Sequence, residues 1–401
     1  FMFEHLEMAP ADPIFGLTEA FKKDPNPAKI NLGVGVYQDE TGKTPIFRAV
    51  KEAERRLVDT ERNKSYLGIA GDTEFLTEAK ALIFQGADDL VTSGRVVLVQ
   101  TPGGTGGVRV GAEFLRLAAP GAGVWMSEPT WPNHPNIFRA AGYKPQTYPY
   151  FDPAANRLAF GRMLEALERV PEGDVVLLHG CCHNPTGIDP SLEQWEELAS
   201  FLAERNLVPL VDFAYQGLGE GWTEDSQGVL ALCRKLPEVL VASSFSKNFG
   251  LYCERLGALA VIAADAGRAQ VALSHLEQVI RSNYSNPPAH GARIVTTILR
   301  DPGLRADWEA ELGSMRIRLA ETRRAFVERL RELGVERDFS YLARQRGIFS
   351  FSGLTRGQVE LLRRRYSIYL VNSGRINVAG INAGNLDYLC SAVAEVIREL
   401  P

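Results

Sequence analysis

Lys247 is the residue of this chain whose setting first suggests covalent chemistry. It lies in ASSFSKNFG (242–250), among small side chains and directly after the apolar run 239–241. A partly desolvated lysine loses its proton more readily and becomes a nucleophile toward a carbonyl group. A strand, a turn and an exposed charge would give the same pattern, and on this stretch alone that simpler interpretation is favoured.

A glycine-rich stretch indicates a group that the chain could bind. VVLVQTPGGTGG (96–107) predicts a strand that runs into a glycine-rich turn, followed by a helix over 108–117. Glycines let the backbone approach an anion closely, and a helix N-terminus presents unpaired N–H groups to it. The stretch matches neither the dinucleotide nor the P-loop pattern. It therefore indicates the phosphate of another ligand, with a plain tight turn as the alternative.

Polar residues follow two further apolar runs. Asp212 ends the run in LVPLVDFAYQG (207–217), with Tyr215 shortly after it, and Asn184 follows the run in VVLLHGCCHNPTG (175–187). Ligands of open α/β sheets gather at the carboxyl ends of strands. A carboxylate there is costly unless it meets a cation or a donor. Asp212 is thus a ligand candidate, with a cap on the next helix as the alternative.

The same stretch holds Cys181, Cys182 and His183, which suggests a cysteine–histidine nucleophile pair. Adjacent residues of an extended strand point to opposite faces, so we do not expect acyl transfer by this pair. Asn184 offers both a donor and an acceptor and is the better ligand candidate.

Two more residues complete the set of candidates. Trp131 in SEPTWPNHP either packs or stacks on an aromatic ring, and Arg375 in NSGRINVAG suits bidentate capture of a carboxylate. Together the parts require a ligand with a phosphate, a planar ring with a basic nitrogen for Asp212, and a carbonyl for Lys247. Pyridoxal phosphate fits that description.

The elements that would position these residues alternate along the chain. Short runs that are apolar at successive positions are typical of strands buried on both faces of a parallel sheet. The runs are 96–99, 123–126, 175–178, 207–211, 239–241 and 258–263. Helical stretches such as 192–205 would cover that sheet, which predicts an α/β architecture.

The domain organisation follows from the ends of the chain. Residues 307–334 carry apolar side chains at three- to four-residue spacing, which predicts a long helix joining two domains, with a coiled-coil seam as the alternative. RGIFSFSGL, IYLV and GRINVAG predict strands of a smaller α+β domain. We expect an extended N-terminal arm (1–13), a small domain (14–44 and 315–401) and a large domain (45–314).

Composition excludes several classes of protein. The 401 residues are 45% hydrophobic and 23% charged, which is ordinary for a globular chain. A net charge of −5 without a basic block argues against nucleic acid and anionic membrane as partners. Five cysteines without C-x-x-C spacing form no disulfide framework and no zinc site, so we expect no metal. Without a signal-like N-terminus or a long apolar run, we expect a cytoplasmic protein.

Several long stretches resemble the aspartate aminotransferase group of the class I aminotransferases, which are fold-type I pyridoxal-phosphate enzymes. The resemblance runs from INLGVGVYQDETGKTP (30–45) to YLVNSGRINVAG (369–380), through HGCCHNPTG, DFAYQG, SSFSKNFGLYCERLGAL and NYSNPPAHGA. It implies a large domain with a mostly parallel sheet covered by helices, plus a smaller α+β domain. Lys247 matches the Schiff-base lysine of the family.

The resemblance also implies how the cofactor is held. Asp212 would pair with the pyridinium nitrogen and keep the ring cationic, Asn184 and Tyr215 would bond its phenolic oxygen, and Trp131 would stack on the ring. The positions that match phosphate-binding residues are Gly104, Thr105, Ser244, Arg255 and, from the neighbouring subunit, Tyr66.

For the substrate, Gly35 and Arg375 match positions that hold the α-carboxylate. Arg281 matches an arginine of the neighbouring subunit that meets a second, distal carboxylate. The resemblance thus implies a homodimer with shared active sites, acting on amino acids and 2-keto acids. Lys247 would act first as nucleophile and then as the acid and base that moves the Cα proton.

The resemblance leaves the preferred amino acid open. Ser65 and Gln38 depart from the asparagine and lysine common in aspartate-selective members, whereas Thr44, Thr105 and Asn286 match that type. We expect transfer between aspartate and 2-oxoglutarate, giving oxaloacetate and glutamate. A preference for aromatic amino acids is the first alternative, and a pyridoxal-phosphate lyase or decarboxylase is the second. A non-catalytic regulatory protein is disfavoured because the lysine is present and no DNA-binding segment is.

Overall fold

The chain divides into two compact units, which are described separately. A computed structural model describes residues 1–10 and 12–401. Unit 1 comprises Phe1–Lys43, Ala320–Arg344 and Ile348–Pro401, and unit 2 comprises Thr44–Leu319 and Gln345–Gly347. The predicted arm (1–13) includes Ala11, which lies outside the described residues. The assignment of domains to 14–44 with 315–401 and to 45–314 stays a prediction.

Unit 2 contains a seven-stranded sheet in the order β2-β10-β9-β8-β7-β3-β4. β10 is antiparallel to both of its neighbours, and the pairs from β9 to β4 are parallel. This confirms the predicted mostly parallel sheet. The strands are β2 (Val96–Pro102), β3 (Val124–Glu128), β4 (Gln146–Pro149), β7 (Val175–His179), β8 (Val208–Phe213), β9 (Val239–Ser244) and β10 (Leu256–Ile262).

Each of the six apolar runs overlaps a strand of this sheet, but β4 was not predicted. β4 is the edge strand beside β3, and its first two residues are exposed while Tyr148 is buried. An edge strand with solvent on one side lacks the continuous apolar run that marks a central strand. A short hairpin of β5 (Phe151–Asp152) and β6 (Arg157–Leu158) follows it.

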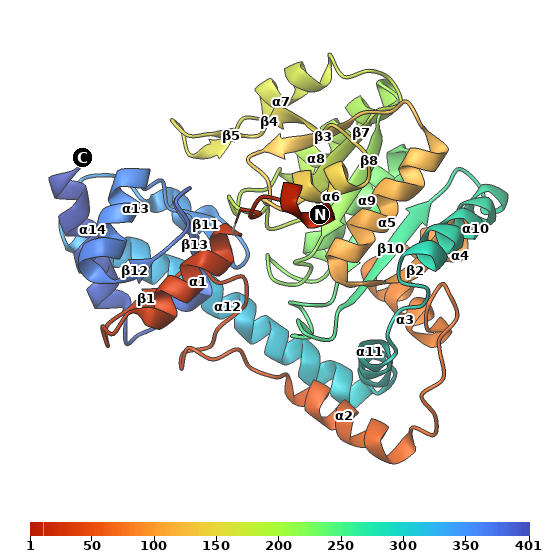
Figure 1. The fold of residues 1–401 in the computed structure, drawn as a ribbon, viewed down its shortest axis with the longest axis horizontal. Helices are drawn as coiled ribbons and strands as arrows, with labels where there is room; N and C mark the ends of the chain where they lie inside the picture. Colours follow the sequence, from red (N-terminus) through yellow and green to blue (C-terminus); the bar gives the residue numbers. More distant parts are fainter. Residues whose placement is uncertain (11) are drawn as a thin grey trace. The chain divides into compact units, whose positions relative to one another are not determined.

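Helices cover the sheet of unit 2, as Figure 1 shows for the green and yellow strands and the helices around them. α5 packs on β2, β8, β9 and β10, and its Gly111 lets the helix approach Leu210 and Leu259 closely. The helices are α2 (Arg48–Thr60), α3 (Thr73–Ile83), α4 (Asp88–Thr92), α5 (Gly103–Ala118), α6 (His134–Ala140), α7 (Phe160–Leu167), α8 (Leu192–Glu204), η2 (Glu224–Ser226), α9 (Gln227–Lys235), α10 (Ala266–Asn283) and α11 (His290–Arg300).

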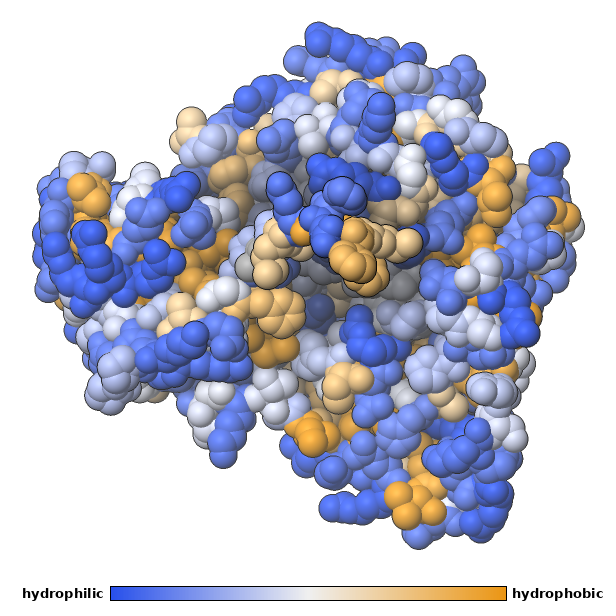
Figure 2. Space-filling view, viewed as in Figure 1, coloured by the Kyte–Doolittle hydropathy of each residue, from blue (hydrophilic) through white to orange (hydrophobic). Residues whose placement is uncertain are grey.

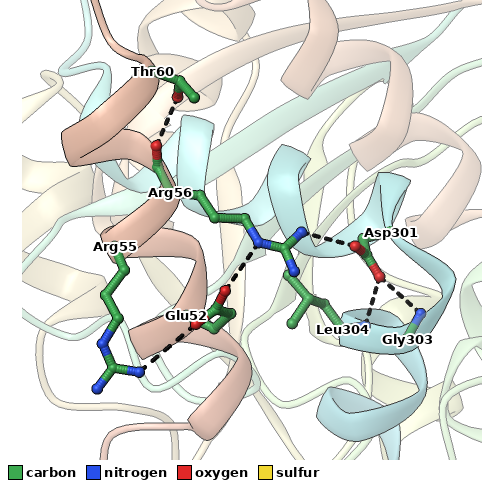
Figure 3. Close-up of polar contacts among 7 residues, drawn as sticks. All are labelled: Glu52, Arg55, Arg56, Thr60, Asp301, Gly303 and Leu304. Atoms are coloured by element: carbon green, nitrogen blue, oxygen red, sulfur yellow. Dashed lines mark hydrogen bonds and ion pairs between the residues drawn. The ribbon is translucent and has the colours of Figure 1, made fainter.

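The predicted long helix is α12 (Pro302–Glu332), which contributes residues to both units. It begins earlier than predicted because Asp301 caps it, accepting hydrogen bonds from the N–H groups of Gly303 (2.8 Å) and Leu304 (3.0 Å). Arg56 of α2 donates to the same carboxylate at 2.7 Å and to Glu52 at 3.1 Å (Figure 3). These bonds join α2 to the start of α12.

Unit 1 is an α+β unit, as predicted. β1 (Ile30–Asn31) pairs in parallel with β12 (Ile368–Tyr369), and β11 (Phe349–Phe351) pairs antiparallel with β13 (Arg375–Asn377). Its remaining elements are η1 (Met2–His5), α1 (Pro13–Lys23), η3 (Ser340–Arg344), α13 (Arg356–Tyr366), η4 (Val378–Gly380) and α14 (Leu386–Glu399).

The N-terminal residues differ from the extended arm that the sequence predicted. Met2–His5 form a turn of 3₁₀-helix, and their apolar side chains are exposed. Figure 2 shows hydrophobic groups scattered among mostly hydrophilic ones on the surface. Within the described residues, no helix combines the length and the apolar character that crossing a membrane would require.

Candidate active site

The predicted residues of unit 2 meet at one edge of its sheet. The register places His179, at the end of β7, beside Asp212 of β8, and Asp212 beside Ala242 of β9. On the other side, Pro102 at the end of β2 lies opposite Leu256, where β10 begins. The carboxyl ends of the parallel strands therefore share an edge, which is where open α/β sheets bind ligands.

Asp212 is a partly buried anion with a specific partner. Its carboxylate accepts a hydrogen bond from Nε2 of His134 at 2.7 Å, and the histidine side chain is fully buried. Burial raises the pKa of Asp212, but the hydrogen bond from His134 and the electrostatic interactions with His134, His179 and Lys247 outweigh it and hold the pKa below its ordinary value. The residues after β8 form turns, so the alternative of a helix cap is wrong.

A chain of hydrogen bonds behind Asp212 can direct a proton toward its carboxylate. The backbone N–H of Asn184 donates to Nδ1 of His179 at 3.4 Å, and burial lowers the pKa of His179 to about 3, so its ring is neutral. The remaining proton on Nε2 of His179 therefore points to the hydroxyl of Thr130, at 3.0 Å. Thr130 then donates to Nδ1 of His134 (2.7 Å), which leaves the proton of His134 on Nε2, facing Asp212.

His183 contacts this network through its ring. Its ring stacks at 3.9 Å on Tyr150 and lies 4.1 Å from that of His179, and burial lowers its pKa well below the ordinary value. β7 ends at His179, so Cys181–His183 do not form the extended strand that the sequence predicted, and Cys182 has a positive φ of 51°. Burial also raises the pKa of Cys181, which leaves a protonated thiol with little nucleophilic character.

Lys247 lies beside this network, a short turn after β9. Its Nζ is 5.3 Å from the centre of the Tyr215 ring, and its charge is among those that lower the pKa of Asp212. Asn184 donates through Nδ2 to the hydroxyl of Tyr215 at 3.5 Å, a long bond. Among the described residues, Oδ1 of Asn184 is buried without a hydrogen-bond partner. The structure thus brings Lys247, Asp212, Tyr215 and Asn184 together with one unused polar atom.

The glycine-rich stretch forms the first turn of α5, which begins at Gly103 rather than at the predicted residue 108. Gly103 has a φ of +70°, and a Cβ there would lie 2.5 Å from Nη2 of Arg255. A Cβ on Gly104 would lie 3.1 Å from Cβ of Ser244. The absence of side chains therefore lets Ser244 and Arg255 lie directly against the start of α5, which includes Thr105. N–H groups, a hydroxyl and a guanidinium together suit an anion.

Sequence reasoning missed two residues of this site. Arg255 donates to the hydroxyl of Ser246 at 3.4 Å, and the backbone N–H of Ser246 donates to Oγ of Ser244 at 3.2 Å, so Ser246 belongs to the same cradle. His134, which sets the charge of Asp212, was missed as well. Ser246 could have been found from its place beside Lys247, whereas nothing in the sequence relates His134 to Asp212.

Trp131 is half-buried near the same edge. Its ring meets that of His134 edge-on, with ring centres 5.2 Å apart. Tyr66 and Arg281, by contrast, are exposed, with 92% of Tyr66 accessible to solvent. Both lie in unit 2, where their exposure leaves them accessible to another chain.

Gly35 and Arg375 belong to unit 1 and lie near each other within it. Arg375 of β13 is buried, donates to the carbonyl of Gly33 at 3.0 Å, and stacks 4.2 Å above the ring of Phe349. Asn377 of the same strand holds the carbonyls on either side of Gly35, at 2.9 and 2.7 Å. A Cβ on Gly35 would meet open space. Unit 1 therefore presents a fixed guanidinium next to an anchored glycine loop.

Comparison with known proteins identifies this arrangement. The family model of the class I and II aminotransferases matches residues 27–393. The aspartate aminotransferase of Haemophilus influenzae is 51% identical over 396 residues, 99% of this chain and 100% of that protein. The aromatic-amino-acid aminotransferase of Pseudomonas aeruginosa is 48% identical over 99% of each chain. The crystal structure of the aromatic-amino-acid aminotransferase from Burkholderia pseudomallei, covalently bound to pyridoxal phosphate, has a TM-score of 0.97 and 46% identity over 99% of each chain. The chain is a member of the class I and II aminotransferase family.

Proposed function

We propose that this aminotransferase uses pyridoxal phosphate to transfer the amino group between aspartate and 2-oxoglutarate, giving oxaloacetate and glutamate. The observation that carries the proposal is the meeting of Lys247, the anionic Asp212 and the glycine cradle at one edge of the sheet. The chain's similarity to aspartate and aromatic-amino-acid aminotransferases also supports the proposal of a transaminase. We expect the protein to act in the cytoplasm.

The residues present fit the cofactor. The cradle formed by Gly103, Gly104, Ser244 and Arg255 has the donors for a phosphate, and a Cβ on either glycine would crowd Arg255 or Ser244. The buried Oδ1 of Asn184 has no partner among the described residues, so it is a polar atom that a ligand could satisfy. Trp131 offers an aromatic face, and the anionic Asp212 suits a protonated ring nitrogen.

The bound cofactor supplies an electron sink for the carbanion that forms when the substrate loses its Cα proton. The chain supplies the rest. Asp212, kept ionised by His134, would hold a proton on the ring nitrogen. Nζ of Lys247 would hold the cofactor and would take the Cα proton and return it. Tyr215 and Asn184 would offer hydrogen bonds to the ring's phenolic oxygen.

Substrate carboxylates require cationic partners on the protein. Arg375 and the Gly35 loop would hold the α-carboxylate, because the guanidinium is already fixed by Gly33 and Phe349. Arg281 of a neighbouring subunit would hold the distal carboxylate, which fits its exposure in the single chain. A planar guanidinium binds a carboxylate through two parallel hydrogen bonds.

The second candidate is a preference for aromatic amino acids. Relatives with either printed activity are almost equally similar to this chain, at 51% and 48% identity. Initial rates with aspartate, phenylalanine, tyrosine and tryptophan against 2-oxoglutarate decide between the two. A kcat/KM at least tenfold higher for aspartate supports the proposal, and the reverse order overturns it. Keto-acid release without any 2-oxoglutarate would instead indicate a lyase or a decarboxylase.

The proposed homodimer with shared sites has its own test. Subunits with Lys247→Ala and subunits with Arg281→Leu carry different affinity tags, and each variant by itself should be poorly active toward aspartate. The two are mixed, and the heterodimer that carries both tags is isolated. One of its two sites then combines an intact Lys247 with an intact Arg281, so activity with aspartate should return. Heterodimers as inactive as their parents would contradict sharing across the interface.

A further inference from the structure

Two segments of unit 2 carry the residues that we assign to the neighbouring subunit's site. Tyr66 immediately precedes a loop that turns at Gly68 and Gly71 and leads to Asp72, the cap of α3. Arg281 lies in the last turn of α10, shortly before the turn at Tyr284 and Pro288 that leads to α11. The two segments are far apart in sequence, yet in the proposed dimer both would have to reach one site of the partner subunit at the same time.

Gln100 of β2 connects the two segments through its side chain. Its Oε1 accepts a hydrogen bond from the backbone N–H of Asp72 at 3.0 Å. Its Nε2 donates to the carbonyl of Pro288 at 2.7 Å. The residue has no measurable solvent exposure, so its amide is shielded from water, while the two bonds are part-buried at their other ends. One buried amide therefore bridges both segments.

The main chain of Gln100 contacts the same segments. Its N–H donates to the carbonyl of Ala70 at 2.7 Å, and its carbonyl accepts from the hydroxyl of Tyr284 at 3.1 Å. Burial raises the pKa of Tyr284, so this hydroxyl stays a donor. Gly71, with φ of +115°, allows the loop to pack directly on Gln100, since a Cβ there would lie 2.4 Å from Cβ of the glutamine.

A second path joins the segments near the functional side chains themselves. Nη1 of Arg281 donates to the hydroxyl of Ser285, which donates to Oδ1 of Asn286 at 3.0 Å. Nδ2 of Asn286 donates to the carbonyl of Leu67, the residue after Tyr66, at 2.8 Å. The two exposed residues thus sit at the ends of one hydrogen-bonded chain, whose buried support is Gln100.

We propose that Gln100 is a positioning residue that holds Tyr66 and Arg281 in one arrangement, so that they engage the cofactor phosphate and the distal carboxylate of the partner's site together. The inference rests on the proposed shared dimer. Gln100 touches neither ligand and acts only through the two segments. Its loss would leave the N–H of Asp72 and the carbonyl of Pro288 without their buried partner and let the segments move independently.

The experiment compares Gln100→Leu and Gln100→Glu with the wild-type holoenzyme. Leucine removes both side-chain bonds. A protonated glutamic acid can replace both, because one oxygen accepts from Asp72 while the other donates to Pro288, and burial favours that neutral form at low pH. The titratable residues hydrogen-bonded to Gln100 are Asp72, through its backbone, and Tyr284. The matched control is Gln358→Glu in unit 1, whose buried amide likewise bridges a backbone N–H (Thr355, 2.9 Å) and a carbonyl (Leu400, 2.6 Å).

We expect Gln100→Leu to raise KM for aspartate about tenfold, the usual effect of one lost hydrogen bond, with kcat and the KM for phenylalanine changed much less. At pH 5.5, the KM of Gln100→Glu for aspartate should match that of the wild type. At pH 8.5, it should be raised as in Gln100→Leu. The Gln358→Glu control should leave the ratio of the two KM values unchanged at both pH values. Equal changes of KM for the two substrates, or no change with aspartate, would overturn the inference.

Hydrogen exchange supplies a readout that does not depend on turnover. The N–H of Asp72 should exchange about tenfold faster in Gln100→Leu, since its acceptor is gone, and at the wild-type rate in Gln358→Glu. Unchanged exchange would also overturn the inference. Sedimentation separates this outcome from a failure of the proposed function. A fully active monomer would contradict the shared site itself. A dimer whose activity with aspartate depends on Arg281 but does not change when Gln100 is substituted would contradict only the positioning role.

Discussion

The region around Asp212 and the region around Arg281 belong to the same unit but are built in opposite ways. Asp212 is held by a partly buried hydrogen bond from His134, whose side chain has no exposed surface. Arg281 and Tyr66 lie at the surface, and their support is buried behind them at Gln100. Under the proposed function, one chain would supply the groups that transfer the proton, whereas recognition of the distal carboxylate would need a second chain.

The two regions should therefore respond differently to substitution. A change in the buried network leaves a neighbouring polar group without its partner, which affects every substrate. A change in the exposed region removes a contact that only some substrates make. The predictions below test that contrast, beginning with the largest expected effect.

Lys247→Ala should reduce turnover of aspartate and phenylalanine alike by about 10⁴-fold or more, the upper range for a positioned acid–base group. Added cofactor should still bind, because the cradle of Gly103, Gly104 and Arg255 is unchanged. Turnover by stopped assay and cofactor retention by gel filtration with absorbance check both parts. Wild-type rates in this variant would show that another amine does the chemistry.

Arg281→Leu should lower kcat/KM for aspartate by about two to four orders of magnitude, the loss of two charge-assisted hydrogen bonds. Phenylalanine lacks the distal carboxylate and should lose far less. Arg268→Leu is the matched control, since Arg268 is exposed on the same helix and pairs only with the helix-capping Asp265 in the described bonds. Equal losses for the two amino acids would mean that Arg281 braces structure instead of binding substrate.

His134→Ala should slow aspartate and phenylalanine by a similar factor, about tenfold, because the lost hydrogen bond leaves Asp212 less strongly ionised. Removal of that bond takes away the first of the contributions that lower the pKa of Asp212. His134→Asn, whose amide can still donate, should recover part of the rate. The comparison of kcat for the two variants measures this, and a selective loss with aspartate alone would break the contrast between the regions.

The same contrast explains what the sequence could predict. Strands buried on both faces appear in the sequence as continuous apolar runs. For this reason the sequence correctly predicted strands at β2, β7, β8, β9 and β10. The edge strand β4 and the start of α5 were not, because one is half-exposed and the other begins with glycines, which have low helix propensity. The pairing of His134 with Asp212 joins residues from different elements and has no local signal.

The resemblance to a known family, not periodicity, provided the roles of Tyr66 and Arg281. Their surroundings in the chain are ordinary, and an exposed side chain carries no mark of the partner it would meet. Gln100 was not singled out at all, since a polar residue at a strand end acquires meaning only when its four bonded neighbours are known.

A more deeply buried carboxylate, Asp225, sharpens the comparison and should give the smallest effect. It accepts hydrogen bonds from the N–H groups of Gly217, Gly219 and Glu220, in the loop that follows Tyr215. Asp212 has a histidine donor and the nearby Lys247, whereas Asp225 has these neutral N–H groups and the like charge of Asp189. Burial therefore prevails and raises the pKa of Asp225 to about 6.

The sign of the pH dependence follows from that difference. Between its ordinary value of 3.8 and about 6, the folded protein binds this proton and the unfolded chain does not, so stability gains as the pH falls. From pH 7 to pH 5 the gain is about 1 kcal/mol. Asp225→Asn cannot titrate at this position. As the pH is lowered from 7 to 5, the melting temperature of the wild type should therefore rise relative to that of the variant. A constant difference between the two proteins caused by altered hydrogen bonds does not affect this trend. Asp301→Asn is the contrasting control. The bond from Arg56 lowers the pKa of Asp301 below its ordinary value of 3.8, so its stabilisation is lost only below that pH and should stay constant from pH 7 to pH 5 (Figure 3). A gap between wild type and Asp225→Asn that stays constant from pH 7 to pH 5 would show that the hydrogen bonds of the loop, and not burial, dominate at Asp225.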